Sequence, residues 1–416
     1  MPPSAEVATK QLASVCEKLG ISPLWHRLYH PRHPHDVHHA IDYWFFMHDP
    51  EEGPPTLQKA VRQYVLARSK EDLSALKRAG WLDKEKGRPW AKRLKAEEWQ
   101  DLWPLLRAAN FLRAEKRLAS AEPASSKRGL TFRERVREQL QKWADLELTD
   151  FPKTGSEAEH TSSGLIALLA ADSLTRPHGL EQSESLYAKV VSPHCRLIKE
   201  EFGDDVDVLP VSINFNTVRD FTAHGVSLAM AWKNMNLILF PESGEDGVSA
   251  YFHDADDGKH SEVVFHEILH CTSEVGESSD QDTMSLIESR ELLEEGLVTA
   301  GSQRLIEGLG EESYKSVYPP HAALCRALEE RLGGESMASL RRHPSRQKPA
   351  LLAEHLGVPL ETLTNELHHY YEKTCLVWQD EMAETDRCTS TDKAIAKTLP
   401  GLMERLCGPV SRSKKA

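Results

Sequence analysis

The sequence predicts an α+β protein that is predominantly helical and contains a small sheet. Apolar residues recur at helical spacing on otherwise charged segments at positions 60–68 and 134–140, as on the buried stripe of a surface helix. Short apolar runs at 206–215, 236–241 and 248–252 are typical of β-strands. A few strands set among helices indicate the α+β class.

The chain is long enough, at 416 residues, for two or three domains. Residues 1–150 read as a helical N-terminal region without a catalytic signature, and the segment 121–127 has the composition of a loop or linker. We therefore expect a second domain over 151–416. It would have a core at about 205–306 that carries the chemistry, followed by a helical part over 307–410.

Composition and charge exclude several classes of protein. The net charge of −13 argues against nucleic-acid binding over the whole molecule. Seven cysteines without a CxxC pair argue against a disulfide framework or a cysteine-based zinc site. No apolar run approaches eighteen residues, so no membrane span is predicted. The N-terminus lacks the pattern of a secretory signal, and we expect a cytoplasmic protein.

An HExxH motif lies in the apolar run 263–271, where His266 and Glu267 are followed by His270. On a helix, residues four apart lie on one face, so both imidazoles can reach a single ion at about 2.0–2.1 Å. Glu267 is displaced around the helix and can accept a proton from a water molecule instead of binding the metal. Two unpaired histidines on such a buried helix would be costly. The motif therefore predicts a metal site.

The third ligand is expected on a helix predicted over 284–306, because an open catalytic site needs three protein ligands. The segment 293–297, Leu-Glu-Glu-Gly-Leu, resembles the third-ligand signature of gluzincin-type zinc metallopeptidases. In that group, HExxH is followed by a ligating glutamate on the next helix. The resemblance covers roughly residues 205–306 and implies a zincin-like peptidase domain. Because Glu294 stands where the family has Asn, Glu294 and Glu295 compete for the ligand role, and Glu295 is favoured.

Matched residue by residue, the resemblance implies that His266, His270 and Glu295 bind Zn²⁺. It implies that Glu267 is the general base, which acts on a metal-activated water. Gly296 would allow a neighbouring helix to approach closely. An extended substrate could pair with the edge of a strand above the active-site helix, supplied by residues 248–252 or 236–240.

The sequence departs from the family at Thr299, where many gluzincins have an Asp that orients the first histidine; Asp280 and Asp282 are possible substitutes. A donor for the oxyanion is also expected. In similar enzymes it is a Tyr or His after the third ligand, and Tyr318 is favoured. The candidates are Tyr314, Tyr318, His321, His368, His369, Tyr370 and Tyr371.

These features predict a zinc-dependent peptidase that acts on proteins or peptides. Two alternatives remain. A helix-turn-helix near 349–371, with the basic run 341–348 before it, would make the protein a DNA-binding regulator beside a metalloprotease-like domain. Its second helix, however, is short of Arg, Lys and Asn. The other alternative is a non-catalytic interaction protein that keeps the fold. The oligomeric state is left open.

Overall fold

The described part of the chain is mostly helical and contains a small three-stranded sheet, which confirms the predominantly helical α+β class. None of the described helices is long and apolar enough to cross a membrane. The computed structural model describes residues 4–19, 54–83, 127–145, 179–213, 229–241, 258–274, 283–310, 318–384 and 389–408, together with isolated positions between 86 and 174.

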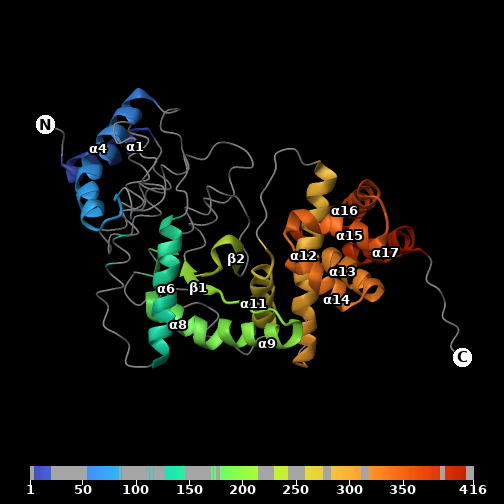
Figure 1. Cartoon of the computed structure of the whole chain (residues 1–416). Coiled ribbons are helices and arrows are strands. Elements are labelled where there is room, and N and C mark those ends of the chain that lie inside the picture. Colours follow the sequence, from blue (N-terminus) through green and yellow to red (C-terminus); the bar gives the residue numbers. More distant parts are fainter. Residues whose placement is uncertain are drawn as a thin grey trace, which may run out of the picture. The chain divides into compact units, whose positions relative to one another are not determined.

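The chain divides into two compact units. One comprises Met1–Ser185, Val211–Ser227 and Phe240–Val248, and the other comprises Leu186–Pro210, Leu228–Leu239 and Ser249–Ala416. The described helices of the first are α1 (Ala5–Lys18), α4 (Pro55–Arg78), α6 (Lys127–Asp145) and most of α8 (Gly179–Leu186). Helices α1 and α4 pack against each other (Figure 1), and Leu12 on α1 and Tyr64 on α4 are fully buried.

The helical pattern at 60–68 is confirmed within α4, and the pattern at 134–140 within α6. After α8 the chain continues through a π-helical turn (Tyr187–Val191) into α9 (Ser192–Phe202).

The sheet has the strand order β1-β3-β2. The predicted strand at 206–215 is found as β1 over Leu209–Ile213, and the run at 236–241 is confirmed as β3 over Leu237–Pro241. The third predicted strand, 248–252, lies outside the described residues. Instead, β2 (Met230–Trp232) pairs antiparallel with β3.

A short connection joins β2 to β3 as a hairpin. It consists of the 3₁₀ turn η4 (Lys233–Met235) and of Asn236, whose φ of 46° is left-handed. Asn tolerates this conformation better than most residues do. The hairpin fixes Lys233 beside the helices that follow.

Helices form the rest of the second unit. They are α11 (Gly258–His270), α12 (Met284–Gly308), α13 (Pro319–Leu332), α14 (Gly334–Arg342), the 3₁₀ turn η6 (Ser345–Gln347), α15 (Lys348–Leu356), α16 (Leu360–Glu384) and α17 (Thr389–Cys407). The HExxH motif is thus on a helix, as predicted, and the helix predicted over 284–306 is α12.

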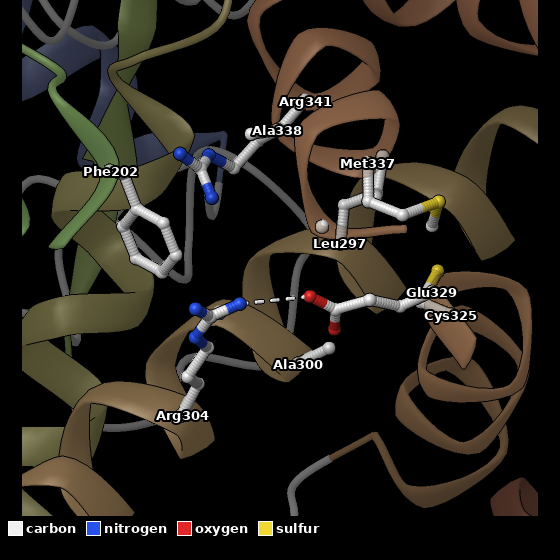
Figure 2. Close-up of a pocket in the computed structure, with 11 residues that line it drawn as sticks. Phe202, Leu297, Ala300, Arg304, Cys325, Glu329, Met337, Ala338 and Arg341 are labelled. Carbon is white, nitrogen blue, oxygen red and sulfur yellow. Dashed lines mark hydrogen bonds and ion pairs between the residues drawn. The ribbon is translucent and has the colours of Figure 1, made fainter. Parts of the chain in front are cut away.

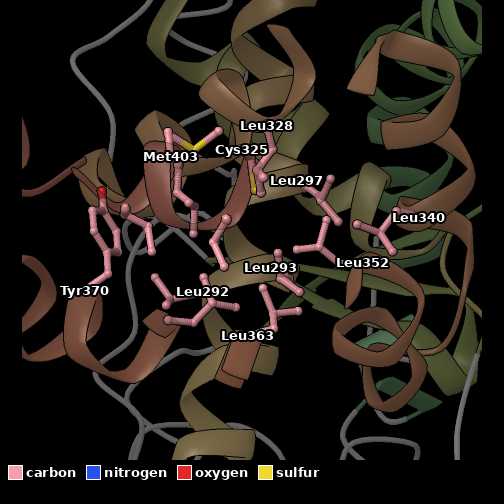
Figure 3. Close-up of a cluster of buried hydrophobic side chains, with 14 of the residues drawn as sticks. Leu292, Leu293, Leu297, Cys325, Leu328, Leu340, Leu352, Leu363, Tyr370 and Met403 are labelled. Atoms are coloured by element: carbon pink, nitrogen blue, oxygen red, sulfur yellow. The ribbon is translucent and has the colours of Figure 1, made fainter. Parts of the chain in front are cut away.

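Helix α12 is the central element of the second unit. It packs against α11, α13, α14, α15 and α16 (Figure 1). Its side chains are buried on nearly all faces from Leu292 to Ile306, as expected for a helix surrounded by others. Figure 3 shows Leu292, Leu293 and Leu297 in contact with a cluster of side chains from the helices around them. This core fixes the rotation of α12, and with it the direction of its polar residues.

Gly296 brings α13 close to α12, as the sequence predicts. A β-carbon at this position would lie 2.5 Å from the carbonyl oxygen of His321 and 2.6 Å from the sulfur of Cys325. Both atoms belong to α13, and a backbone carbonyl cannot move aside without shifting the helix.

We therefore expect Gly296→Ala to destabilise the protein by about 1–3 kcal/mol, the usual range for overpacking. Gly308 is the matched control, because it ends the same helix and a β-carbon there would meet nothing within 4 Å. Gly308→Ala should be neutral or stabilise by up to about 1 kcal/mol. Urea denaturation of the two variants measures the difference; equal stabilities would contradict the close packing.

Candidate metal centre

Helix α11 places the two histidines of the motif one turn apart. The Nε2 atoms of His266 and His270 are 3.1 Å apart, and the rings meet edge to face. Other faces of α11 are buried through Phe265, Ile268 and Leu269, which have no exposed surface. The apolar face therefore anchors the helix, and the imidazoles converge on one point.

Glu295 reaches the same point from α12. Its Oε2 lies 3.3 Å from His266 Nε2 and 3.4 Å from His270 Nε2. A metal ion about 2.0–2.1 Å from tetrahedral ligands requires those ligands to lie about 3.3–3.4 Å from one another. The spacing of the three atoms is therefore compatible with three ligands of one ion. Among the described His, Cys, Asp and Glu side chains, these three form the cluster that could share a metal ion.

Glu294 takes a different position from its neighbour. Its Oε1 lies 3.3 Å from Nδ1 of His270, and its carboxylate also binds the ammonium groups of Lys233 and Lys348. Burial alone would raise the pKa of Glu294, but the hydrogen bond from His270 and the two lysine charges hold that pKa well below its usual range. Glu294 is therefore ionised and contacts the outer nitrogen of His270.

Thr299 contacts the outer nitrogen of the other histidine. Its Oγ1 lies 3.3 Å from Nδ1 of His266, at the position where the family resemblance predicts an Asp. The hydroxyl can accept a hydrogen bond from Nδ1–H, and in that tautomer the Nε2 lone pair is free for a metal. Asp280 and Asp282, the substitutes considered from the sequence, lie outside the described residues.

The two carboxylates also affect the protonation of His270. Burial lowers the pKa of this imidazole, but Glu295 and Glu294 outweigh that effect and raise the pKa to about 9. At neutral pH the metal-free imidazole is therefore protonated. A metal must displace the Nε2 proton, so we expect metal binding to release a proton and to weaken as the pH falls.

Glu267 is held beside the cluster by the sheet. Its Oε2 accepts a hydrogen bond of 2.6 Å from the backbone N–H of Ala231 in β2. Burial is the largest influence on the pKa of Glu267 and raises it, against the lowering effect of the two imidazoles. Within the described sheet, β2 is an outer strand and β3 is central. The expectation that residues 236–240 supply a strand edge is therefore wrong, and β2 lies at the edge beside the motif.

Tyr318, the favoured oxyanion donor, has a ring contact with His266. It precedes α13 at the N-cap position, and its ring lies parallel to that of His266, with the centroids 5.8 Å apart and an interplanar angle of 9°. Burial raises the pKa of Tyr318, and the carboxylates of Glu295 and Glu267 raise it further. The phenol therefore keeps its proton and can act as a hydrogen-bond donor.

The other predicted donors are placed differently. His321 is fully buried, and burial lowers its pKa to about 4, so it is neutral. Tyr370 donates to the carbonyl of Pro320, and His368 binds Glu288. The hydroxyl of Tyr371 faces Glu291, and His369 is exposed. Tyr314 lies outside the described residues.

A small cavity lies behind α12, on the side away from Glu295. Arg304 donates a hydrogen bond of 3.0 Å to Glu329 across it, and Figure 2 shows Phe202 and Arg341 nearby. Its volume is about 30 Å³, room for about one or two water molecules. None of the three candidate ligands lines this cavity, so it is separate from the candidate metal centre.

The comparisons with known proteins give no relative: no family model, no curated protein and no solved structure matches the chain. The arrangement of side chains on α11, α12 and β2 is therefore the basis on which a function can be proposed.

Proposed function

We propose that this chain is a zinc-dependent peptidase with a zincin-like domain of the gluzincin type. One observation carries the proposal. Two imidazole nitrogens and one carboxylate oxygen form a triangle with edges of 3.1, 3.3 and 3.4 Å, and Glu267, a potential base, lies beside them. An ion held by these three atoms would keep one position open for a water molecule beside Glu267.

The ion would be held by the Nε2 atoms of His266 and His270 and by Oε2 of Glu295. Neutral imidazoles with one carboxylate in a four-coordinate arrangement favour Zn²⁺ over the harder Mg²⁺ and Ca²⁺, which prefer oxygen ligands. When bound, zinc would act as a Lewis acid that polarises the substrate carbonyl and acidifies water.

Glu267 moves the proton in this proposal. It accepts a proton from the water whose oxygen attacks the carbonyl carbon, and it delivers that proton to the amine nitrogen when the C–N bond breaks. The bond from Ala231 N–H fixes Oε2. Burial raises the pKa of Glu267, which makes the carboxylate a stronger base than an exposed glutamate.

Tyr318 would stabilise the oxygen that becomes negatively charged during the attack. A protonated phenol stacked beside His266 can supply a fixed hydrogen-bond donor, as oxyanion holes do. A substrate in extended conformation would lie along β2, the outer strand beside α11.

Metal dependence is the direct test of the proposed activity. The zinc-loaded protein is expected to cleave members of a mixed peptide library, with new termini identified by mass spectrometry. Dialysis against a chelator should abolish the cleavage, and one equivalent of zinc should restore it. Cleavage that survives complete removal of metal, or a zinc-loaded protein that cuts no peptide, would contradict the proposal.

DNA binding receives less support from the described residues. Helices α15 and α16 do meet at Gly357, which has a left-handed φ of 67°, but α16 packs against α12 through buried Leu363 and Leu367. Its exposed positions up to Tyr371 carry no Arg or Lys. In the preceding basic run, Arg341 and Lys348 are buried against acidic partners.

A further inference from the structure

Two lysines from distant parts of the chain meet at one buried carboxylate. Lys233, in the hairpin turn after β2, binds Oε1 of Glu294, and Lys348, the first residue of α15, binds Oε2. Lys348 has no exposed surface, and its ammonium group also lies 3.3 Å from the hydroxyl of Ser273. The proposed catalytic steps use neither lysine.

Stability alone does not explain this arrangement. A buried ion pair often contributes no more to stability than apolar side chains of the same volume, because both charges lose their hydration. Fully buried lysines are rare for the same reason. The apolar core around Leu293 and Leu352 lies nearby, so a leucine or methionine at position 348 would suit the surroundings. The pair is therefore better explained by what Glu294 contacts.

Glu294 and Glu295 are neighbours in sequence but point about 100° apart around α12. Glu295 reaches Nε2 of both histidines, whereas Glu294 contacts Nδ1 of His270. Each oxygen of Glu294 has its own ammonium partner, and Oε1 also faces the imidazole. With both oxygens engaged, Glu294 cannot rotate toward the metal position without breaking an ion pair.

We propose that Lys348, assisted by Lys233, is a positioning residue of the metal centre. It holds the Glu294 carboxylate on Nδ1 of His270 and away from the ion, so that Glu295 completes the ligand set. The inference deepens the proposed function and rests on it. It also gives α15, more than fifty residues after the ligands in sequence, a direct role in metal affinity.

The test is the zinc dissociation constant, measured by competition with a chelating dye, of the wild type, Lys348→Met, Glu294→Gln and the double variant. Loss of a partner behind a ligating histidine weakens metal binding by about 10–100-fold, and we expect this for each single variant. The double variant, Lys348→Met with Glu294→Gln, should bind zinc no more weakly than Glu294→Gln alone, because Lys348 acts through the carboxylate of Glu294. Lys348→Arg should recover part of the affinity.

The sign of the effect separates this role from simple electrostatics. A lysine that acts only by its charge repels the cation, so its removal would tighten zinc binding. Tighter or unchanged binding in Lys348→Met, or additive losses in the double variant, would overturn the proposal. Lys199→Met is the control for loss of one lysine, because Lys199 pairs with Asp205 on the surface.

If Lys348→Met fails to fold, Lys233→Met provides the same comparison, because Lys233 binds the same carboxylate and is partly exposed. Lys233→Met should also weaken zinc binding in the otherwise wild-type protein. In the Glu294→Gln background the same substitution should have no further effect on the dissociation constant. A wild-type protein that binds no zinc would refute the proposed function itself. Zinc binding in the wild type with no effect of either lysine would refute the positioning role alone.

Discussion

Glu267→Gln is expected to lower the peptidase rate by about 10²–10⁴-fold, the range typical of a lost general base, while the protein keeps its zinc. The amide has nearly the same shape as the carboxylate, and its oxygen can still accept the bond from Ala231 N–H. It cannot take up a proton. Initial rates on a cleaved peptide, with the metal content of the same preparations, measure the effect.

Glu274→Gln is the matched control for this variant. Glu274 follows α11 and its side chain is exposed, so loss of its charge should leave the rate unchanged. A Glu267→Gln protein with wild-type turnover would show that another group moves the proton. Loss of zinc in this variant would show instead that Glu267 contributes to metal binding.

Glu295→Ala is expected to lose the metal altogether. Wild-type protein should retain one zinc per chain after gel filtration, and the variant should retain less than about a tenth of an equivalent, because two histidines alone leave half of the four-coordinate shell open. Elemental analysis of the purified proteins measures this directly.

Glu291 offers the control, because it precedes Glu295 by one turn on the same face of α12 and lies outside the ligand cluster. Glu291→Ala should keep its zinc. If Glu295→Ala kept a full equivalent of zinc and Glu294→Ala lost it, Glu294 would be the ligand, and Glu295 would not.

The parts of the site that lie close together in sequence could be predicted from it. The HExxH spacing predicts a helix with both imidazoles on one face, and α11 has that form. The glycine after Glu295 predicts a close helix contact, and the structure confirms the short approach of His321 to Gly296. The first prediction depends only on the period of one helix, and the second depends on the missing side chain of one glycine.

The parts that depend on distant segments could not be predicted. Strand β2 has three residues, Met230 to Trp232, too few for an alternating pattern to be recognised. Lys348 lies in a basic run that suggests a solvated surface, yet it is fully buried. Its partner is more than fifty residues away, and no local pattern carries that information. Thr299 appears in sequence only as a departure from the family, although its hydroxyl reaches His266.

The concentration of roles on α12 has a consequence for how the gene can change. Glu294, Glu295, Gly296 and Thr299 work together only at one rotational setting of the helix. Insertion or deletion of one residue just before Glu294 would turn all four by about 100°. Such a change would displace the proposed ligand Glu295, the contacts of Glu294 and Thr299 with the two imidazoles, and the close packing of α13 at Gly296. We therefore expect this segment to accept substitutions far better than changes in length.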